Sequence, residues 1–366
     1  MSNRRNWLKK VSLGIVGLGV GQLETFSNPI TDKYDLNTVD FPILLRSNEN
    51  PYGPSPLARV AMAESVNISN RYGWKTTSEL ISEIAKRNIV NSNNILTAAG
   101  STEILDLVLL FAAHEKGSFI IANPTYDYWT YPSEKLGLSR ISVPLDANKK
   151  YDLSAMLNAI KSDTRLIYIC NPNNPTGTIC KRDELVNFIN EVPKKIIVLV
   201  DEAYIDFTRQ QSLTNLVLEN KNLIIAKTFS KMYGLAGARI GYAVAHETTI
   251  NQISELISGS NSSVSVVSAA GALASLKDEG FKEKVYVLNE KVKKYTIDQL
   301  ENLNITCIPS NSNFIYFSLL NYKKDFFAQL EKYNIQGTKI YEENGKWSRI
   351  TMGTMQEMEM FIKALK

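Results

Sequence analysis

The chain of 366 residues has few of the residues that build metal centres, disulfide frameworks and hydrolytic triads. Its three cysteines, Cys170, Cys180 and Cys307, are too few for a disulfide framework, and their spacing fits no zinc ribbon. Its two histidines, His114 and His246, exclude a histidine-rich metal centre and disfavour a Ser-His-Asp triad. The content of 44% hydrophobic and 21% charged residues excludes wholesale disorder, a collagen-like repeat and a multi-span membrane protein.

Excess charge is also scarce outside the first residues. Residues 1–26 hold Arg4, Arg5, Lys9 and Lys10 against Glu24, so they contribute +3 of the formal net charge of +4. The remaining chain is almost neutral, which argues against the electrostatic footprint of a nucleic-acid-binding protein. We expect no nucleic-acid partner.

The first residues resemble a twin-arginine export signal, with paired arginines, Trp7–Leu8 and then the apolar run from Val11 to Val20. Extended to Leu23, the run would form a helix of about 20 Å, too short for a bilayer core of about 30 Å. We therefore expect residues 1–27 to direct export to the periplasm without forming a stable membrane span. The alternative is a plain N-terminal arm on a cytoplasmic protein.

From about residue 95, short β-rich runs alternate with amphipathic helical patterns, which predicts an α/β fold with a mostly parallel sheet covered by helices on both faces. The predicted strands are 95–98, 118–122, 140–143, 165–170, 196–200, 223–226 and 240–244, and the predicted helices between them are 103–113, 128–136, 153–160 and 182–190.

Long helical patterns after about residue 247 predict a smaller α+β domain at the end of the chain. Its predicted elements are a helix over 281–302, a strand over 313–318, a helix over 325–333, a strand near 347–352 and a helix from 355. We expect residues 28–70 to form the N-terminal part of this smaller domain and residues 271–366 to form its C-terminal part. Residues 71–270 would form the large domain.

The most informative stretch is TFSKMYGLAGARIG, residues 228–241, which follows a predicted strand. A lysine at a strand end, such as Lys231, is suited to lose its charge by desolvation and to form a Schiff base. The hydroxyls of Thr228 and Ser230 and the planar fork of Arg239 could hold a phosphate. Taken alone, a Ser-Lys pair more often lies in a solvated loop than in a catalytic site.

Three other strand ends support the chemical interpretation. Asp201 follows a buried run and could meet a buried cation, although an isolated carboxylate there more often satisfies loop amides. Asn174 lies in NPNNPTGT, which could equally be a simple turn. The run AAGSTEIL predicts a helix that begins near Ser101 and Thr102, whose amides could bind an anion.

In this order, the motifs resemble those of fold-type I pyridoxal phosphate (PLP) aminotransferases of the class I/II superfamily, nearest to the histidinol-phosphate aminotransferases. The matching stretches are NENPYGPSP, RYGW, GSTE, PTYDYW, NPNNPTG, DEAYIDF, TFSKMYGLAGARIGY and RITMGT, and they span nearly all of the chain beyond the signal-like segment. The resemblance implies a homodimer, the PLP-dependent transferase fold and an amino-group transfer between an amino donor and a 2-oxo acid.

The resemblance also assigns roles to residues. Lys231 corresponds to the Schiff-base lysine and proton carrier, and Asp201 to the partner of the pyridinium nitrogen. Asn174 and Tyr204 would donate to the phenolic oxygen of the cofactor, and Tyr126 would stack on its ring. The phosphate would be held by Ser101, Thr102, Thr228, Ser230 and Arg239, and by Tyr72 of the partner subunit.

Substrate contacts are implied for Arg349, which would clamp a carboxylate, and for Asn50 and Tyr52 at the entrance. Members of the histidinol-phosphate group typically carry a further arginine shortly before the position of Arg349. Here Lys339 is the basic residue near that place, and RYGW replaces the more usual RYP. We therefore expect histidinol phosphate or a similar amino donor, with aromatic amino acids also accepted. Two alternatives are a decarboxylase of an amino-acid phosphate on the same scaffold and a non-catalytic PLP-fold binding protein.

Overall fold

The computed structural model describes residues 42–258 and 264–366. The signal-like segment 1–27 and residues 28–41 of the predicted small domain lie outside the described residues. In the part that is described, no helix is long and apolar enough to cross a membrane.

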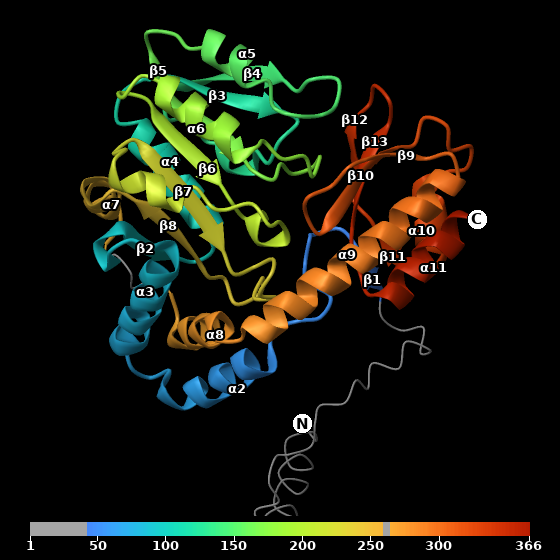
Figure 1. Ribbon diagram of the computed structural model, residues 1–366, viewed down its shortest axis with the longest axis horizontal. Helices are drawn as coiled ribbons and strands as arrows, with labels where there is room; N and C mark the ends of the chain where they lie inside the picture. The colour runs from blue at the N-terminus through green and yellow to red at the C-terminus, as the bar shows by residue number, and fades with distance from the viewer. Residues whose placement is uncertain (1–41, 259–263) are drawn as a thin grey trace, which may run out of the picture. The chain divides into compact units, whose positions relative to one another are not determined.

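A seven-stranded sheet in the order β2-β8-β7-β6-β5-β3-β4 forms the centre of the larger part (Figure 1). Strand β8 is antiparallel to β2 and β7, and the remaining neighbours pair in parallel. The prediction of a mostly parallel sheet is therefore confirmed. The strands are β2 (Ile95–Ala98), β3 (Gly117–Asn123), β4 (Leu138–Pro144), β5 (Thr164–Cys170), β6 (Ile197–Asp201), β7 (Leu223–Thr228) and β8 (Gly241–Ala245).

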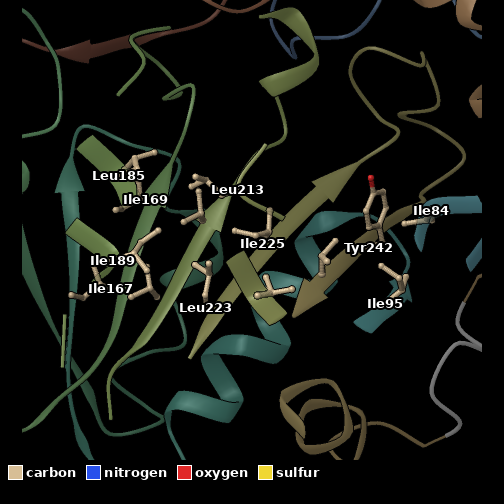
Figure 2. Packing of buried hydrophobic residues seen from close by; sticks show 14 of the residues in the cluster. Ile84, Ile95, Ile167, Ile169, Leu185, Ile189, Leu213, Leu223, Ile225 and Tyr242 are labelled. Atoms are coloured by element: carbon tan, nitrogen blue, oxygen red, sulfur yellow. The ribbon is translucent and has the colours of Figure 1, made fainter. Parts of the chain in front are cut away.

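Both faces of this sheet are buried, because alternate side chains along one strand enter two different clusters. In β5, Ile167 and Ile169 pack with helices on one face, whereas Leu166 and Tyr168 pack on the other. Figure 2 shows the first face, where Leu185 and other side chains meet those of the sheet. This face is covered by α3 (Trp74–Asn88), α5 (Leu153–Asn158), α6 (Arg182–Glu191) and α8 (Val266–Leu276), and the other by α4 (Ser101–Ala112) and α7 (Glu247–Ser254).

One predicted helix is wrong. Over 128–136 the chain forms only the 3₁₀ turn η3 (Tyr128–Thr130), followed by further turns. Pro132 lies in the middle of the predicted helix, where it has no N–H to donate and its ring disfavours the helical ladder. This irregular segment runs past the carboxyl end of β3. Other short 3₁₀ turns are η1 (Val66–Ile68), η2 (Ser92–Asn94), η4 (Ile205–Phe207) and η5 (Thr214–Leu218).

The C-terminal part contains an antiparallel sheet in the order β12-β13-β10-β9, whose apolar face packs against helices around Phe317, Phe361 and Leu330. Its elements are α9 (Glu279–Asn302), β9 (Thr306–Ile308), β10 (Phe314–Ser318), α10 (Phe326–Lys332), β12 (Ile340–Glu342), β13 (Trp347–Thr351) and α11 (Met355–Leu365). The helix predicted over 281–302 thus begins two residues earlier, at Glu279, where Asp278 caps it.

The segment after residue 42 contacts both parts. Strand β1 (Ile43–Leu44) pairs in parallel with β11 (Ile335–Gln336), whereas α2 (Pro56–Ser65) packs against α8. Residues 43–44 thus join the C-terminal part, and α2 joins the larger one. The predicted domain boundaries stay predictions.

Candidate active site

The carboxyl ends of the parallel strands meet the C-terminal sheet at a cavity of about 720 Å³. Open α/β sheets collect ligands at this edge. Twelve of the residues singled out in the sequence line the cavity: Ser101, Thr102, Tyr126, Asn174, Asp201, Tyr204, Thr228, Ser230, Lys231, Arg239, Lys339 and Arg349. Residues more than 200 positions apart are thus brought to one place.

Lys231 is partly exposed to the cavity, three residues after the end of β7. Its Nζ donates to the backbone oxygen of Ser47 at 3.0 Å and lies 5.8 Å from the centre of the Tyr204 ring. Desolvation, together with the positive charge of Arg349, lowers the pKa of Lys231 to about 8. More of this amine than of an ordinary lysine is therefore neutral, and nucleophilic, near neutral pH.

Asp201, the last residue of β6, is 2% exposed. Its carboxylate accepts from the Ala203 amide at 3.0 Å and from the Tyr168 hydroxyl at 3.1 Å. Burial nevertheless raises the pKa of Asp201 to about 6, against these two donors. A buried carboxylate of this kind is suited to a cationic partner in the cavity, such as a protonated ring nitrogen.

Hydrogen bonds join the Asn174 loop to the C-terminal sheet. Arg349 Nη1 donates to Asn174 Oδ1 at 2.5 Å, and Asn174 Nδ2 donates to the Tyr204 hydroxyl at 3.4 Å. The Tyr204 hydroxyl also accepts from Asn48 Nδ2 at 2.9 Å, and burial raises its pKa. Asn48, which the sequence analysis did not single out, is therefore part of the site.

Arg349, on β13, is 6% exposed, and its guanidinium lies 5.3 Å from the Phe314 ring and 5.5 Å from the Tyr341 ring. Its Nη2 donates to the backbone oxygen of Arg46, but its buried Nε has no partner. A buried donor left unpaired is costly, so this guanidinium fits an anionic ligand that reaches it through the cavity.

An anion cup lies at the other end of the cavity, where α4 begins at Ser101. Gly100, the N-cap of α4, has φ of 87°, and a Cβ atom there would collide with the Arg239 guanidinium. Thr228 Oγ1 donates to Ser230 Oγ at 2.9 Å and accepts from the Ser230 amide at 3.1 Å. Helix amides, two hydroxyls and a guanidinium form the donor set that suits a phosphate dianion.

Three predicted residues lie elsewhere in the single chain. Asn50 donates through Nδ2 to the Met232 backbone oxygen at 2.8 Å, and its Oδ1 accepts from the Tyr52 amide at 3.0 Å. Neither residue lines the cavity; the preceding residues Arg46 to Glu49 do. Tyr72 is 80% exposed and stacks on Trp74, with ring centres 5.3 Å apart. The substrate contacts of Asn50 and Tyr52 and the cross-subunit contact of Tyr72 stay predictions.

The sequence analysis missed Arg46, Asn48, Tyr128 and Tyr341 among the cavity residues. Asn48 begins the stretch NENPYGPSP and Tyr128 lies in PTYDYW, so these two motifs could have drawn attention to them. Arg46 and Tyr341 lie outside the recognised motifs and had no such signal.

Residues 42–365 match the family described as aminotransferase class I and II. A histidinol-phosphate aminotransferase from Caldicellulosiruptor saccharolyticus is 36% identical over 331 residues, covering 88% of this chain and 91% of that protein. An aromatic amino acid aminotransferase from Streptomyces avermitilis is 33% identical over 324 residues, covering 87% of this chain and 88% of that protein.

The fold is also similar to that of histidinol-phosphate aminotransferase from Sinorhizobium meliloti in complex with pyridoxal-5'-phosphate, with a TM-score of 0.81 and 21% identity. The match covers 94% of this chain and 98% of that one. The amine, the buried carboxylate and the anion cup described above fit that cofactor by their chemistry. The chain therefore belongs to the aminotransferase class I and II family, and it is a PLP-dependent aminotransferase.

Proposed function

We propose that this enzyme transfers the amino group of histidinol phosphate, or of a similar and also aromatic amino donor, to a 2-oxo acid such as 2-oxoglutarate. The observation that carries the proposal is the buried Arg349 guanidinium, whose Nε is unpaired, on the same cavity as the Lys231 amine. The names of relatives such as the Caldicellulosiruptor saccharolyticus enzyme support a donor of this class.

The residues of the cavity divide between cofactor and substrate. We assign Ser101, Thr102, Thr228, Ser230 and Arg239 to the cofactor phosphate, Asp201 to its ring nitrogen, and Asn174, Tyr204 and Tyr126 to its ring. When bound, PLP withdraws electrons from the carbon that carries the substrate amine. The buried Asp201 carboxylate would hold a proton on the ring nitrogen and so favour this withdrawal.

Lys231 is assigned both the covalent attachment of the cofactor and the proton transfer. Its pKa of about 8 lets the amine release and regain a proton near neutral pH. The neighbouring Tyr204 ring and the Ser47 carbonyl limit where the amine can lie.

Arg349 and Lys339 are assigned to the substrate. Arg349 presents a planar fork, which matches two oxygens of a carboxylate or phosphate. Lys339 Nζ lies 5.3 Å from the centre of the Tyr128 ring and 5.4 Å from that of Tyr341. A hydrogen bond with Tyr128 raises the pKa of Lys339, so this amine stays charged. The aromatic walls around it suit an aromatic or imidazole side chain.

The assembly and the location of the enzyme belong to the same proposal. We place Tyr72 in the cofactor site of a partner subunit in a homodimer, a position that suits its 80% exposure in the single chain. Residues 1–27, outside the described residues, would direct export through the twin-arginine route, which carries folded proteins.

A half-reaction screen tests the function. The purified protein with PLP is mixed with one amine at a time, and the cofactor absorbance is followed together with the products. Conversion to pyridoxamine phosphate with an oxo product supports transamination. Release of carbon dioxide from an amino-acid phosphate would instead support the decarboxylase, which the aminotransferase relatives make the weaker alternative.

A further inference from the structure

Arg46 continues a strand-like alternation that leaves its side chain outside the hydrophobic core. Ile43 is 8% and Leu45 1% exposed, whereas Leu44 is 47% exposed and Arg46 is also exposed. Successive side chains of an extended segment point to opposite faces, so the buried Ile43 and Leu45 leave Arg46 on the open face. The residue lines the cavity that holds Lys231 and Arg349.

The backbone of this segment is fixed from two sides. The Leu45 amide donates to the Gln336 oxygen at 2.9 Å, and the Leu45 oxygen accepts from the Thr351 amide at 2.9 Å. The Arg46 oxygen in turn accepts from Arg349 Nη2. The parallel pairing of β1 with β11 ends at Gln336, and the residues that follow each strand, Arg46 on one side and Thr338 and Lys339 on the other, line the same cavity.

The charges at this end of the cavity favour an anion. Two of the carboxylates that line the cavity already have partners. Asp127 forms a salt bridge with Arg140 at 2.8 Å, and Asp201, at the end of β6, accepts two hydrogen bonds. Within residues 42–258 and 264–366, Arg46 forms no salt bridge. At this end of the cavity the remaining charged residues are three cations, Arg46, Lys339 and Arg349, and one carboxylate, Glu49. Positive charge is therefore in excess.

We propose that Arg46 supplies the second guanidinium of the substrate site and binds a phosphate or carboxylate at the substrate end remote from the reacting amine. This specificity-determining role rests on the proposed function. It replaces, from a different segment, the fork that the stretch between Gly337 and Trp347 lacks. Lys339 adds a point charge beside it, so a remote anion meets a fork and an ammonium together.

The test rests on histidinol phosphate and histidinol, two amine donors that differ only in the phosphate, and adds glutamate and phenylalanine as amino acids with and without a side-chain carboxylate. Single-turnover half-reactions are measured without any 2-oxo acid, with histidinol phosphate, histidinol, glutamate and phenylalanine. Wild type is compared with Arg46→Ala, Arg46→Lys and the control Arg165→Ala, whose guanidinium pairs with Glu115 and does not line the cavity. Calorimetric binding of histidinol phosphate and histidinol is measured in parallel, so that the result does not depend on turnover.

We expect Arg46→Ala to weaken binding and to lower the half-reaction efficiency for histidinol phosphate by about 10- to 100-fold, and for histidinol by less than about twofold. Arg46→Lys should show a smaller loss than Arg46→Ala. The control Arg165→Ala should behave as wild type with both donors. The glutamate arm tells whether a carboxylate can replace the phosphate.

Equal losses with histidinol phosphate and histidinol, or no loss with either, would overturn the role of Arg46. The proposed function fails separately, if no donor is converted by the wild type. In that case an Arg46-dependent preference for histidinol phosphate over histidinol in calorimetry still supports the anion site, and the absence of that preference refutes it.

Discussion

The guanidinium of Arg239 occupies the space that a Cβ atom on Gly100 would need. Gly100 also has φ of 87°, a backbone conformation that residues with a side chain rarely adopt. The start of α4 and the arginine can therefore approach one phosphate together only because residue 100 is a glycine.

We expect Gly100→Ala to weaken PLP affinity by at least about tenfold, because it displaces Arg239 and strains the N-terminus of α4. Fluorescence titration of the cofactor-free protein measures the affinity, and circular dichroism checks the fold. Gly237→Ala is the matched control, since nothing lies within 4 Å of the Cβ atom that it adds. Equal affinities of the Gly100→Ala variant and the control would contradict the proposed cup.

Lys231→Ala should abolish transamination and still allow non-covalent binding of PLP through the cup. In the wild type, the rate of covalent cofactor capture should rise with pH and level off above about 8, the pKa of Lys231. Borohydride reduction followed by peptide mapping identifies the lysine. Lys227 serves as an internal control: burial acts to lower its pKa, but the Glu202 carboxylate raises it above the usual value. Reduced cofactor attached to Lys227 would contradict the assignment of Lys231.

Asp201→Asn should stabilise the cofactor-free protein above pH 7 and impair transamination. Burial raises the pKa of Asp201 from 3.8 to about 6, so the folded state prefers the protonated acid. The contribution of Asp201 to the stability of the wild type is therefore fully present below about pH 4 and is lost as the pH rises through about 6. The shift corresponds to about 3 kcal/mol, which the asparagine variant avoids. Thermal unfolding at pH 4 and pH 8 measures it; a variant no more stable at pH 8 would refute the argument.

Tyr72→Phe should lower PLP affinity about fivefold, the cost of one hydrogen bond to a phosphate, and only in the dimer. Sedimentation gives the oligomeric state, and cofactor titration gives the affinity. Tyr333→Phe, at the end of α10, controls for loss of a hydroxyl that does not line the cavity. A monomer with full activity would remove the cross-subunit role.

Changing both Arg4 and Arg5 to lysine should leave the protein inside the cell, because lysine keeps the charge but not the guanidinium pair. Cell fractionation with an enzyme assay measures the distribution. If the unmodified protein is already wholly cytoplasmic, the segment is an N-terminal arm.

The strands of the large sheet could be predicted because their apolar runs are short and bounded by polar motifs, as in Ile197–Asp201. The same motifs located most of the site, since side chains at parallel strand ends converge at one edge. The helix predicted over 128–136 failed because its apolar spacing suggested a helix that Pro132 prevents.

Arg46 could not be found from the sequence for a different reason. It lies two residues after β1, which is held near the C-terminal sheet by its pairing with β11, between residues almost 300 positions apart. Such a long-range pairing has no local pattern. The pKa of Lys231 is lowered by desolvation and by the charge of Arg349, and both depend on contacts that are distant in sequence. Local motifs therefore predicted the cofactor end of the cavity better than the substrate end.

The pairing of β1 with β11 also sets the order of events during synthesis. A ribosome releases the chain from its N-terminus, so Ile43 must wait for Ile335 before β1 has a partner. The residues of the phosphate cup, from Ser101 to Arg239, are all synthesised before Arg349. A chain that stops before Arg349 should therefore still carry the residues that hold a phosphate, but it should be inactive toward a substrate.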